Sequence, residues 1–384
     1  MYSTSRKEAV QQEISKLISA KEDQMMVMLK IQVVLLVLLG TVTISCNEKK
    51  IDVPELPGNA CIVCDRISLM EKLKPAIADK YWPGFDNDSL RSPLVYFDDS
   101  TSWLAFSETN LFKGKVTAQK MICGGGLSVF RLSKRLDSVP FHMENRMSFT
   151  DSTSPVFYNP VMFCSNTEAA KSLVPVVTGT EEWLQMILHE YFHAFQFRHL
   201  NTIKYLADSI KTGSDTLDRL YKKNLLFAKL LETENNFLLH ALSSISKDSS
   251  TFYAREFLVA REYRRKEGNR IISKEIIRIE KFWEKIEGTA RYIEYNTGFI
   301  FAAGNFKSNL TCDSLFNNFN AYKETDFTKR AWFRKKTKII TAYYYVTGFN
   351  LCRLMDKLGI AYKEHLFDRT EYGLEDYLQK AINY

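Results

Sequence analysis

The segment His189-Glu190-Tyr191-Phe192-His193 constrains the fold more than any other part of this chain. It lies in an apolar run, residues 183–197, whose pattern predicts a helix. Residues four positions apart lie on one face of a helix, so both imidazoles can reach a single metal ion. Glu190 can contact a water molecule on that ion without binding the ion itself. The motif therefore predicts a metal site with His189 and His193 as ligands, Glu190 as general base and a third ligand elsewhere.

Composition allows a large folded chain and gives no sign of a nucleic-acid partner. Of 384 residues 45% are hydrophobic, and the formal net charge is +7. The basic clusters, residues 261–266 and 334–338, are short or interleaved with acidic residues, which is typical of solvated helix faces. No nucleic-acid-binding motif accompanies them, so we expect no nucleic-acid partner.

The amino terminus carries the pattern of an export signal. Residues 31–45 form an apolar stretch of signal-peptide length, which follows Lys30 and directly precedes Cys46. A small residue followed by Cys resembles the cleavage site of bacterial lipoproteins, in which that Cys becomes the lipidated first residue. The alternative is an uncleaved membrane anchor over residues 25–45, and Lys30 and Gln32 within that window count against it.

We therefore expect residues 1–45 to be a signal or anchor segment, with Met28 as an alternative start of translation. Cys46 is then the site of lipidation, and residues 46–60 form a tether. This arrangement predicts an exported lipoprotein held on the periplasmic or outer-surface face of a bacterial envelope.

Six cysteines remain if Cys46 is acylated, and an exported chain can oxidise them. Six cysteines allow fifteen connectivities, and the sequence does not choose among them. Cys61 and Cys64 form a CxxC pair without a second CxxC or a thioredoxin-like context. The pair therefore favours a structural disulfide or free thiols over a redox or zinc centre.

The rest of the chain divides into two parts that predict an α+β fold. Residues 61–177 begin with a helix over 62–80 and continue as a β-rich part, with strand-like runs at 94–97, 103–106, 116–119, 127–132 and 156–163. Residues 178–384 are mainly helical, beginning with a capping box at 178–181 and continuing over 202–213, 216–245, 251–265, 270–297 and 331–358. A sheet followed by helices places the metal site between the two parts.

Glu287 is the best candidate for the third ligand. It lies in the segment Trp283-Glu-Lys-Ile-Glu-Gly-Thr-Ala-Arg-Tyr-Ile-Glu294. This W-x-x-x-E-G-x-A-x-Y pattern resembles the second motif of gluzincins, the clan of thermolysin-like and peptidase MA-like zinc metallopeptidases. The resemblance implies a zincin-like fold and one Zn²⁺ ion bound by His189, His193 and Glu287. Gly288 and Ala290 would let the two helices that carry these ligands approach closely beside the metal.

The spacing leaves a rival for that position. Ninety-four residues separate His193 from Glu287, more than in compact members of the clan, and an insertion of two helices near 216–265 would account for this. Glu232-Thr-Glu234 lies on the preceding helix and is the alternative source of a ligand. Glu284 and Glu294 are expected to lie behind the ligands or on the surface.

A tetrahedral oxyanion requires a further hydrogen-bond donor, which gluzincins commonly take from a Tyr or His on a later helix. Tyr345, three residues before Gly348, is the candidate, with Tyr344 as the alternative. The remaining histidines, His142, His199, His240 and His365, are expected to have structural or surface roles.

These features together predict a lipid-anchored zinc metallopeptidase that cleaves peptide or protein substrates at a bacterial cell envelope. The alternative is a catalytically silent lipoprotein that keeps the zincin scaffold and binds a peptide or glycan. The intact Glu190 argues against that alternative, because a purely structural zinc ion needs no base. A metal-free structural lipoprotein would require the motif to be accidental.

Overall fold

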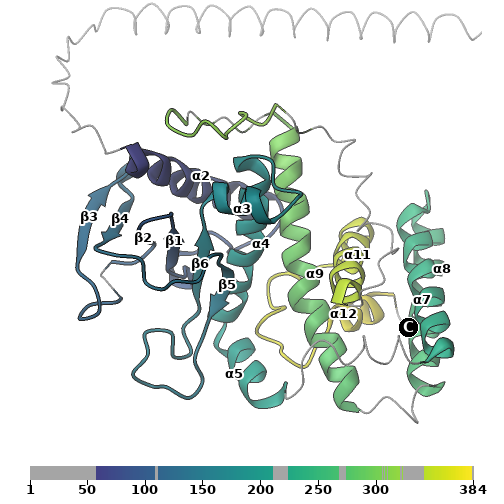
Figure 1. Cartoon of the computed structure of the whole chain (residues 1–384). Coiled ribbons are helices and arrows are strands. Elements are labelled where there is room, and N and C mark those ends of the chain that lie inside the picture. The colour runs from purple at the N-terminus through teal and green to yellow at the C-terminus, as the bar shows by residue number, and fades with distance from the viewer. Residues whose placement is uncertain are drawn as a thin grey trace, which may run out of the picture. The chain divides into compact units, whose positions relative to one another are not determined.

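A computed structural model describes residues 58–108, 111–210, 224–267, 274–304, 306, 308, 310–320, 322 and 341–382. These residues belong to one compact unit with an α+β fold (Figure 1). The unit begins with α2 (Gly58–Lys80), continues through a six-stranded sheet, and is mainly helical from α3 (Thr167–Leu173) onward. The predicted order of a β-rich part followed by a helical part is confirmed.

The sheet is mixed, and its spatial order is β3-β4-β2-β1-β6-β5. β1 pairs parallel with β6, whereas the other neighbours pair antiparallel. The strands are β1 (Leu94–Phe97), β2 (Ser102–Ala105), β3 (Ala118–Ile122), β4 (Ser128–Leu132), β5 (Met143–Arg146) and β6 (Val161–Ser165). β3 and β5 therefore form the two edges of the sheet.

Both faces of the central strands are buried, which explains why their sequences are almost continuously apolar. Along β1, Leu94 and Tyr96 belong to the large core shared with α2 and with the helix that carries His189. Val95 and Phe97 belong to a smaller core on the opposite face. This alternation is the two-residue period of a strand.

The helical part is built around α4 (Thr180–Arg198), which carries the His189 motif, and α9 (Lys274–Ala302), which packs directly against it (Figure 1). α4 also contacts β5 and β6, so it lies between the sheet and α9. The remaining helices are α5 (Leu200–Ser209), α7 (Leu225–Ser243), α8 (Lys247–Glu267), α11 (Thr341–Leu358) and α12 (Leu374–Ala381). α7 and α8 pack on each other where the sequence predicted a two-helix insertion.

One strand and two α-helices were not predicted. β5 has the polar sequence Met-Glu-Asn-Arg, and α3 and α12 span only seven and eight residues, less than the window in which a helical period stands out. The predicted capping box is displaced by one residue. Gly179 is the N-cap, and the Glu182 carboxylate accepts hydrogen bonds from the Gly179 N–H at 2.9 Å and the Thr178 hydroxyl at 3.0 Å.

Glu181 does not cap the helix. Its carboxylate holds a segment distant in sequence against the start of α4. Its carboxylate accepts hydrogen bonds from the N–H groups of Asn317 at 2.8 Å and Phe319 at 3.0 Å. In the same segment, Asp313 accepts hydrogen bonds from the Thr180 hydroxyl at 2.6 Å and from buried Arg66 of α2. We call residues 312–319 the α4 clamp.

Two disulfides fasten α2 to the rest of the unit. Cys61 is bonded to Cys312 at the start of the α4 clamp, and Cys64 is bonded to Cys123 after β3. The two cysteines of the CxxC pair thus form structural disulfides with distant partners rather than with each other. Cys164 and Cys352 are buried free thiols.

The predicted signal, Cys46 and residues 46–57 of the predicted tether lie outside the described residues. The last three residues of that tether, 58–60, belong to α2. Among the helices that the structure describes, none is both long enough and apolar enough to cross a membrane.

Candidate metal centre

Buried hydrogen bonds hold α4 against the sheet region, both before its motif and within it. The Trp183 indole donates to the Ser165 carbonyl at 2.9 Å, and the Tyr191 hydroxyl donates to the Ser92 carbonyl at 2.6 Å. The Asn145 side chain of edge strand β5 donates to the Glu190 carbonyl at 2.7 Å. These contacts fix the rotation of α4, so His189 and His193 face α9 rather than the sheet.

The two histidines and the Glu190 carboxylate gather at one point. The ligand atoms of His189, Glu190 and His193 lie within 4.8 Å of one another, and the group could hold a metal ion. Glu287 approaches the same point from α9, with its Oε2 3.3 Å from His193 Nε2 and 3.9 Å from His189 Nε2. Two segments 94 residues apart in the sequence therefore meet at the predicted site.

The other ring nitrogen of each histidine contacts a second side chain. His193 Nδ1 lies 2.8 Å from Oε1 of Gln196, and the Gln196 amide nitrogen donates to the Ile286 carbonyl at 2.9 Å and the Thr289 hydroxyl at 2.7 Å. Those two donations fix the orientation of the amide, so its oxygen accepts from Nδ1–H and the Nε2 lone pair of His193 faces Glu287. Gln196 thereby selects the tautomer that can bind a metal.

A carboxylate also lies beside the other ring nitrogen of His189, although without the hydrogen-bond geometry of the Gln196 contact. His189 Nδ1 lies 3.1 Å from Oε2 of Glu294, which leaves Nε2 directed at Glu287. Arg291 in turn donates to both oxygens of Glu294, at 2.7 and 2.6 Å. Partners of this kind orient metal-binding histidines and increase their basicity.

Electrostatics within this group reflect the close approach of a carboxylate to two imidazoles. Burial alone would lower the pKa of His193, but the charge of Glu287 outweighs burial and raises that pKa to about 9. The pKa of His189 is also raised, against the effect of burial, by Glu287 and Glu294. Burial would raise the pKa of Glu287, yet the two histidines hold it well below its usual range. The site therefore holds an ionised carboxylate.

A test of fit for a metal ion comes from Glu287 itself. Its Oε2 is buried and lies at ion-pair distance from both imidazoles, but it makes no hydrogen bond of good geometry to any residue that the structure describes. A buried, ionised oxygen without a hydrogen-bond partner is costly, and coordination of a cation would satisfy it. Two imidazole Nε2 atoms and one carboxylate oxygen are also the donor set of catalytic zinc sites. The residues present therefore fit a divalent metal ion.

Tyr345 lies against this centre. Its ring stacks on His189, with centroids 5.7 Å apart and an interplanar angle of 14°, and Arg291 covers the ring at 5.1 Å. Burial is the main cause that raises the pKa of Tyr345, and the nearby Glu287 raises it further, so the hydroxyl stays protonated. Tyr344, the alternative, is fully buried with Tyr343 and Phe227 in a separate cluster.

The placement of Tyr345 depends on a close crossing of α9 and α11 at two glycines. A Cβ added to Gly348 would meet the Gly288 Cα at 2.8 Å and would overlap the backbone carbonyl of Glu284. Gly288 directly follows Glu287, and Gly348 lies one helical turn after Tyr345. Gly288 therefore lies at the crossing of α9 with α11, whereas its small size was predicted to matter where the two ligand-bearing helices meet.

A cavity of about 690 Å³ opens onto the centre. Its wall includes Glu182, Met186 and Glu190 of α4, which are spaced four residues apart. These three are partly exposed, whereas the residues between them are buried. Val176, Val177, Arg291 and Tyr345 form further parts of its wall. Glu190 therefore faces a space large enough for part of a peptide.

The other predicted residues have different roles. Glu234, from the rival ligand segment, forms buried ion pairs with Arg261 and Arg264, and Glu232 is exposed. Glu284 binds Arg261, whereas Glu294 lies directly behind His189. Neither Glu232 nor Glu234 belongs to the centre.

The remaining histidines have partners outside the centre. His142 contacts Asp137 at 2.8 Å and stacks on Phe97, and His199 contacts Asp368 at 3.1 Å. His240 packs on Tyr253, and His365 is exposed.

Sequence reasoning missed Gln196 and Arg291. Gln196 carries a readable signal, since it lies three residues after His193 and so shares its helix face. Arg291 carries no comparable signal, because its role depends on the orientation of Glu294 one turn further along α9. A comparison with known proteins found no family model, no curated protein and no solved structure that matches this chain.

Proposed function

We propose that this chain is a zinc metallopeptidase of the gluzincin type, with His189, His193 and Glu287 as the metal ligands. The observation that carries the proposal is the meeting of two imidazole Nε2 atoms and the unsatisfied Glu287 Oε2, with the Glu190 carboxylate beside them. Imidazole and carboxylate ligands suit zinc, and three protein ligands leave one position open for water.

Each remaining residue has a role in the hydrolysis of a peptide bond. A zinc ion held by His189, His193 and Glu287 would supply a bound water molecule with a pKa lowered to about 7 and a Lewis acid for the substrate carbonyl. Glu190 accepts the proton of the attacking water and passes it to the leaving amine. The protonated Tyr345 hydroxyl donates a hydrogen bond to the carbonyl oxygen as that oxygen becomes negative.

An extended peptide is the substrate that the surroundings favour. β5 is an edge strand, so one side of its backbone is available for pairing with another strand. Asn145 of β5 contacts the Glu190 carbonyl, which brings that edge next to the motif. A substrate paired with β5 would pass across the Glu190 end of the cavity.

Metal analysis combined with peptide cleavage tests the proposal. We expect one zinc ion per chain in the purified protein, and cleavage that falls by at least about 1,000-fold in Glu190→Gln while zinc remains bound. Glu287→Gln should lose zinc. Glu232→Gln is the matched control, because this exposed glutamate comes from the rival segment, and it should keep both zinc and activity.

Two outcomes would contradict the proposal. Bound zinc without cleavage across a broad peptide library would favour the catalytically silent scaffold that binds a peptide or glycan. A metal centre would be excluded if the purified protein lacked zinc and the His193→Ala variant showed no loss relative to it.

We also propose that the protein is anchored through a lipid on Cys46 in a bacterial envelope. The support is the apolar stretch that ends directly before Cys46. Metabolic labelling with a fatty acid should mark the native protein and not Cys46→Ser. An unlabelled native protein that stays in the membrane fraction would instead indicate an uncleaved anchor.

A further inference from the structure

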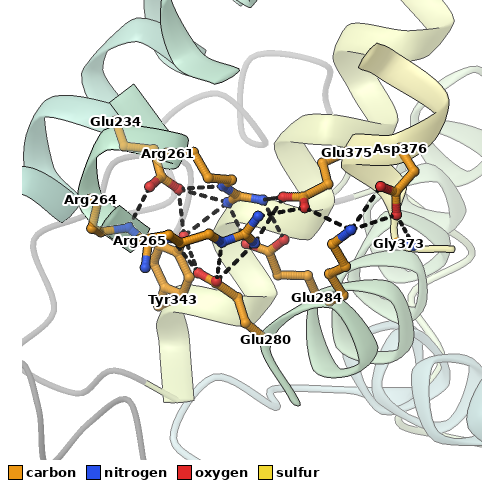
Figure 2. A network of polar contacts seen from close by, with 11 residues as sticks. Glu234, Arg261, Arg264, Arg265, Glu280, Glu284, Tyr343, Gly373, Glu375 and Asp376 are labelled. Atoms are coloured by element: carbon orange, nitrogen blue, oxygen red, sulfur yellow. Dashed lines mark hydrogen bonds and ion pairs between the residues drawn. The ribbon is translucent and has the colours of Figure 1, made fainter. Parts of the chain in front are cut away.

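A buried cluster of charged side chains connects five helices (Figure 2). We call it the Arg261 cluster. It contains Glu234 of α7, Arg261, Arg264 and Arg265 of α8, Glu280 and Glu284 of α9, Tyr343 of α11 and Glu375 of α12. Most of its members are fully buried, with Arg261 and Glu284 each only 1% exposed. None of these residues takes part in the proposed chemistry.

Arg261 is the hub of the cluster (Figure 2). Its guanidinium donates to both oxygens of Glu284, at 2.8 and 2.7 Å, and to the Tyr343 hydroxyl at 2.9 Å. It also donates to Glu234 at 2.8 Å and to Glu375 at 2.6 Å. The Tyr343 hydroxyl in turn donates to Glu234 at 2.7 Å. One side chain therefore ties α9, α11, α7 and α12 together.

Two of those helices carry a residue of the cluster and a residue of the metal centre. On α9, Glu284 lies three positions before Glu287 and therefore on nearly the same face. On α11, Tyr343 lies two positions before Tyr345, which places the two side chains on opposite sides of the helix. α11 thus has the cluster on one side and His189 on the other.

Buried ion pairs add little to stability when compared with a well-packed apolar core, but breaking one is costly. If α11 shifted or rotated against α9, the Tyr343 hydroxyl would lose its bonds to Arg261 and Glu234 within an interior that offers no water. A cluster of this kind therefore fixes the register of the helices that share it. Tyr343 is the residue of α11 that takes part in the cluster, so it fixes the position of α11 relative to the other helices.

We infer that the Arg261 cluster positions the oxyanion donor: the Tyr343 hydroxyl, held by Arg261 and Glu234, sets the register of α11 and thereby places Tyr345 against His189. The inference rests on the proposed function for its catalytic consequence. Its structural content, the dependence of the Tyr345 ring on the Tyr343 hydroxyl, needs neither metal nor substrate.

A ¹⁹F label tests that structural content directly. With 3-fluorotyrosine at position 345 of the full chain in metal-free form, a ring held against His189 and under Arg291 gives a single line displaced from the unfolded value. In Tyr343→Phe, we expect this line to move at least halfway toward the unfolded position. Tyr344→Phe is the matched control, because it removes a buried hydroxyl from the next residue outside the Arg261 cluster, and it should leave the line in place.

Kinetics test the catalytic consequence. Tyr343→Phe should lower kcat roughly tenfold to a hundredfold with KM unchanged, as expected when a catalytic group is displaced by about 1 Å. In a Tyr345→Phe background the same substitution should have no further effect on kcat, because the group that it positions is already absent. Tyr344→Phe should keep the original kcat.

The outcomes separate the inference from the proposed function. An unchanged ¹⁹F line in Tyr343→Phe would overturn the inference, and so would losses of kcat that multiply in the double variant. A displaced line in a protein that cleaves no peptide would support the positioning role and refute the peptidase. A line displaced equally in Tyr344→Phe would reduce the role of Tyr343 to general packing and overturn the inference.

Discussion

Single side chains behind the two histidines decide which ring nitrogen faces the centre. Gln196 accepts from Nδ1 of His193 and is itself fixed by two bonds to α9, and Glu294 lies beside Nδ1 of His189. The histidines are thus held with Nε2 toward Glu287 before any ion binds. Such pre-orientation lowers the entropy that metal binding must remove.

Replacing Gln196 should weaken metal binding without removing a ligand. We expect Gln196→Leu to raise the dissociation constant for zinc about 10- to 100-fold, because the His193 ring loses the acceptor that orients it. Competition with a chelator measures the constant. Gln185→Leu is the matched control, since Gln185 is also buried on α4 and bonds an α9 carbonyl but contacts neither histidine. Equal losses in both variants would show that only packing is involved.

The raised pKa of His193 predicts how the metal-free protein responds to pH. Its folded value of about 9 exceeds the unfolded value of about 6.5. The stabilisation from this residue is therefore complete below pH 6.5 and is lost as pH rises through 9. Urea unfolding with a chelator present should show the free energy of unfolding falling by up to about 3 kcal/mol over that range.

The slope should become shallower in Glu287→Gln, because the largest charge that raises the pKa of His193 is then gone, whereas Glu190 and Glu294 remain. It should disappear in the zinc-loaded protein, in which the imidazole carries no proton on Nε2. An undiminished slope in Glu287→Gln would mean that another group is responsible.

At the scale of elements, the crossing of α9 and α11 determines how closely Glu287 and Tyr345 approach. Gly348→Ala should lower the free energy of unfolding by about 1–3 kcal/mol, because its Cβ would overlap the backbone of α9. Gly124→Ala is the control, since a Cβ there meets nothing within 4 Å, and it should change stability by less than about 0.5 kcal/mol. Denaturant unfolding of both variants measures the difference, and equal values would contradict a tight crossing.

At the scale of the whole molecule, the two disulfides close loops of different length. Cys61 and Cys312 are 251 residues apart, whereas Cys64 and Cys123 are 59 apart. On the chain-entropy account, replacing the first pair by alanine should cost about 1 kcal/mol more stability than replacing the second. Calorimetry of the two double variants measures this difference, and an equal or reversed order would show that local contacts outweigh chain entropy.

The α+β order and the motif helix were predictable from local hydrophobic periods, whereas the position of Glu287 beside the two histidines was implied by the resemblance of its segment to the second gluzincin motif. β5 was missed because its four residues are polar and its pairing with β6 is a tertiary event. The disulfide partners and the Arg261 cluster could not be predicted from the sequence for the same reason. Their members are spread over long stretches of chain, and only folding brings them together.

The Cys61–Cys312 bond also makes the assembly of the candidate metal centre depend on the cellular compartment in which the chain folds. The α4 clamp begins at Cys312 and holds the first turn of the helix that carries His189. Disulfides form in oxidising compartments and not in a reducing cytoplasm. If the chain is the exported hydrolase proposed above, a newly made chain would remain an unassembled precursor until export. Oxidation would then keep its activity away from the proteins of the cell that makes it.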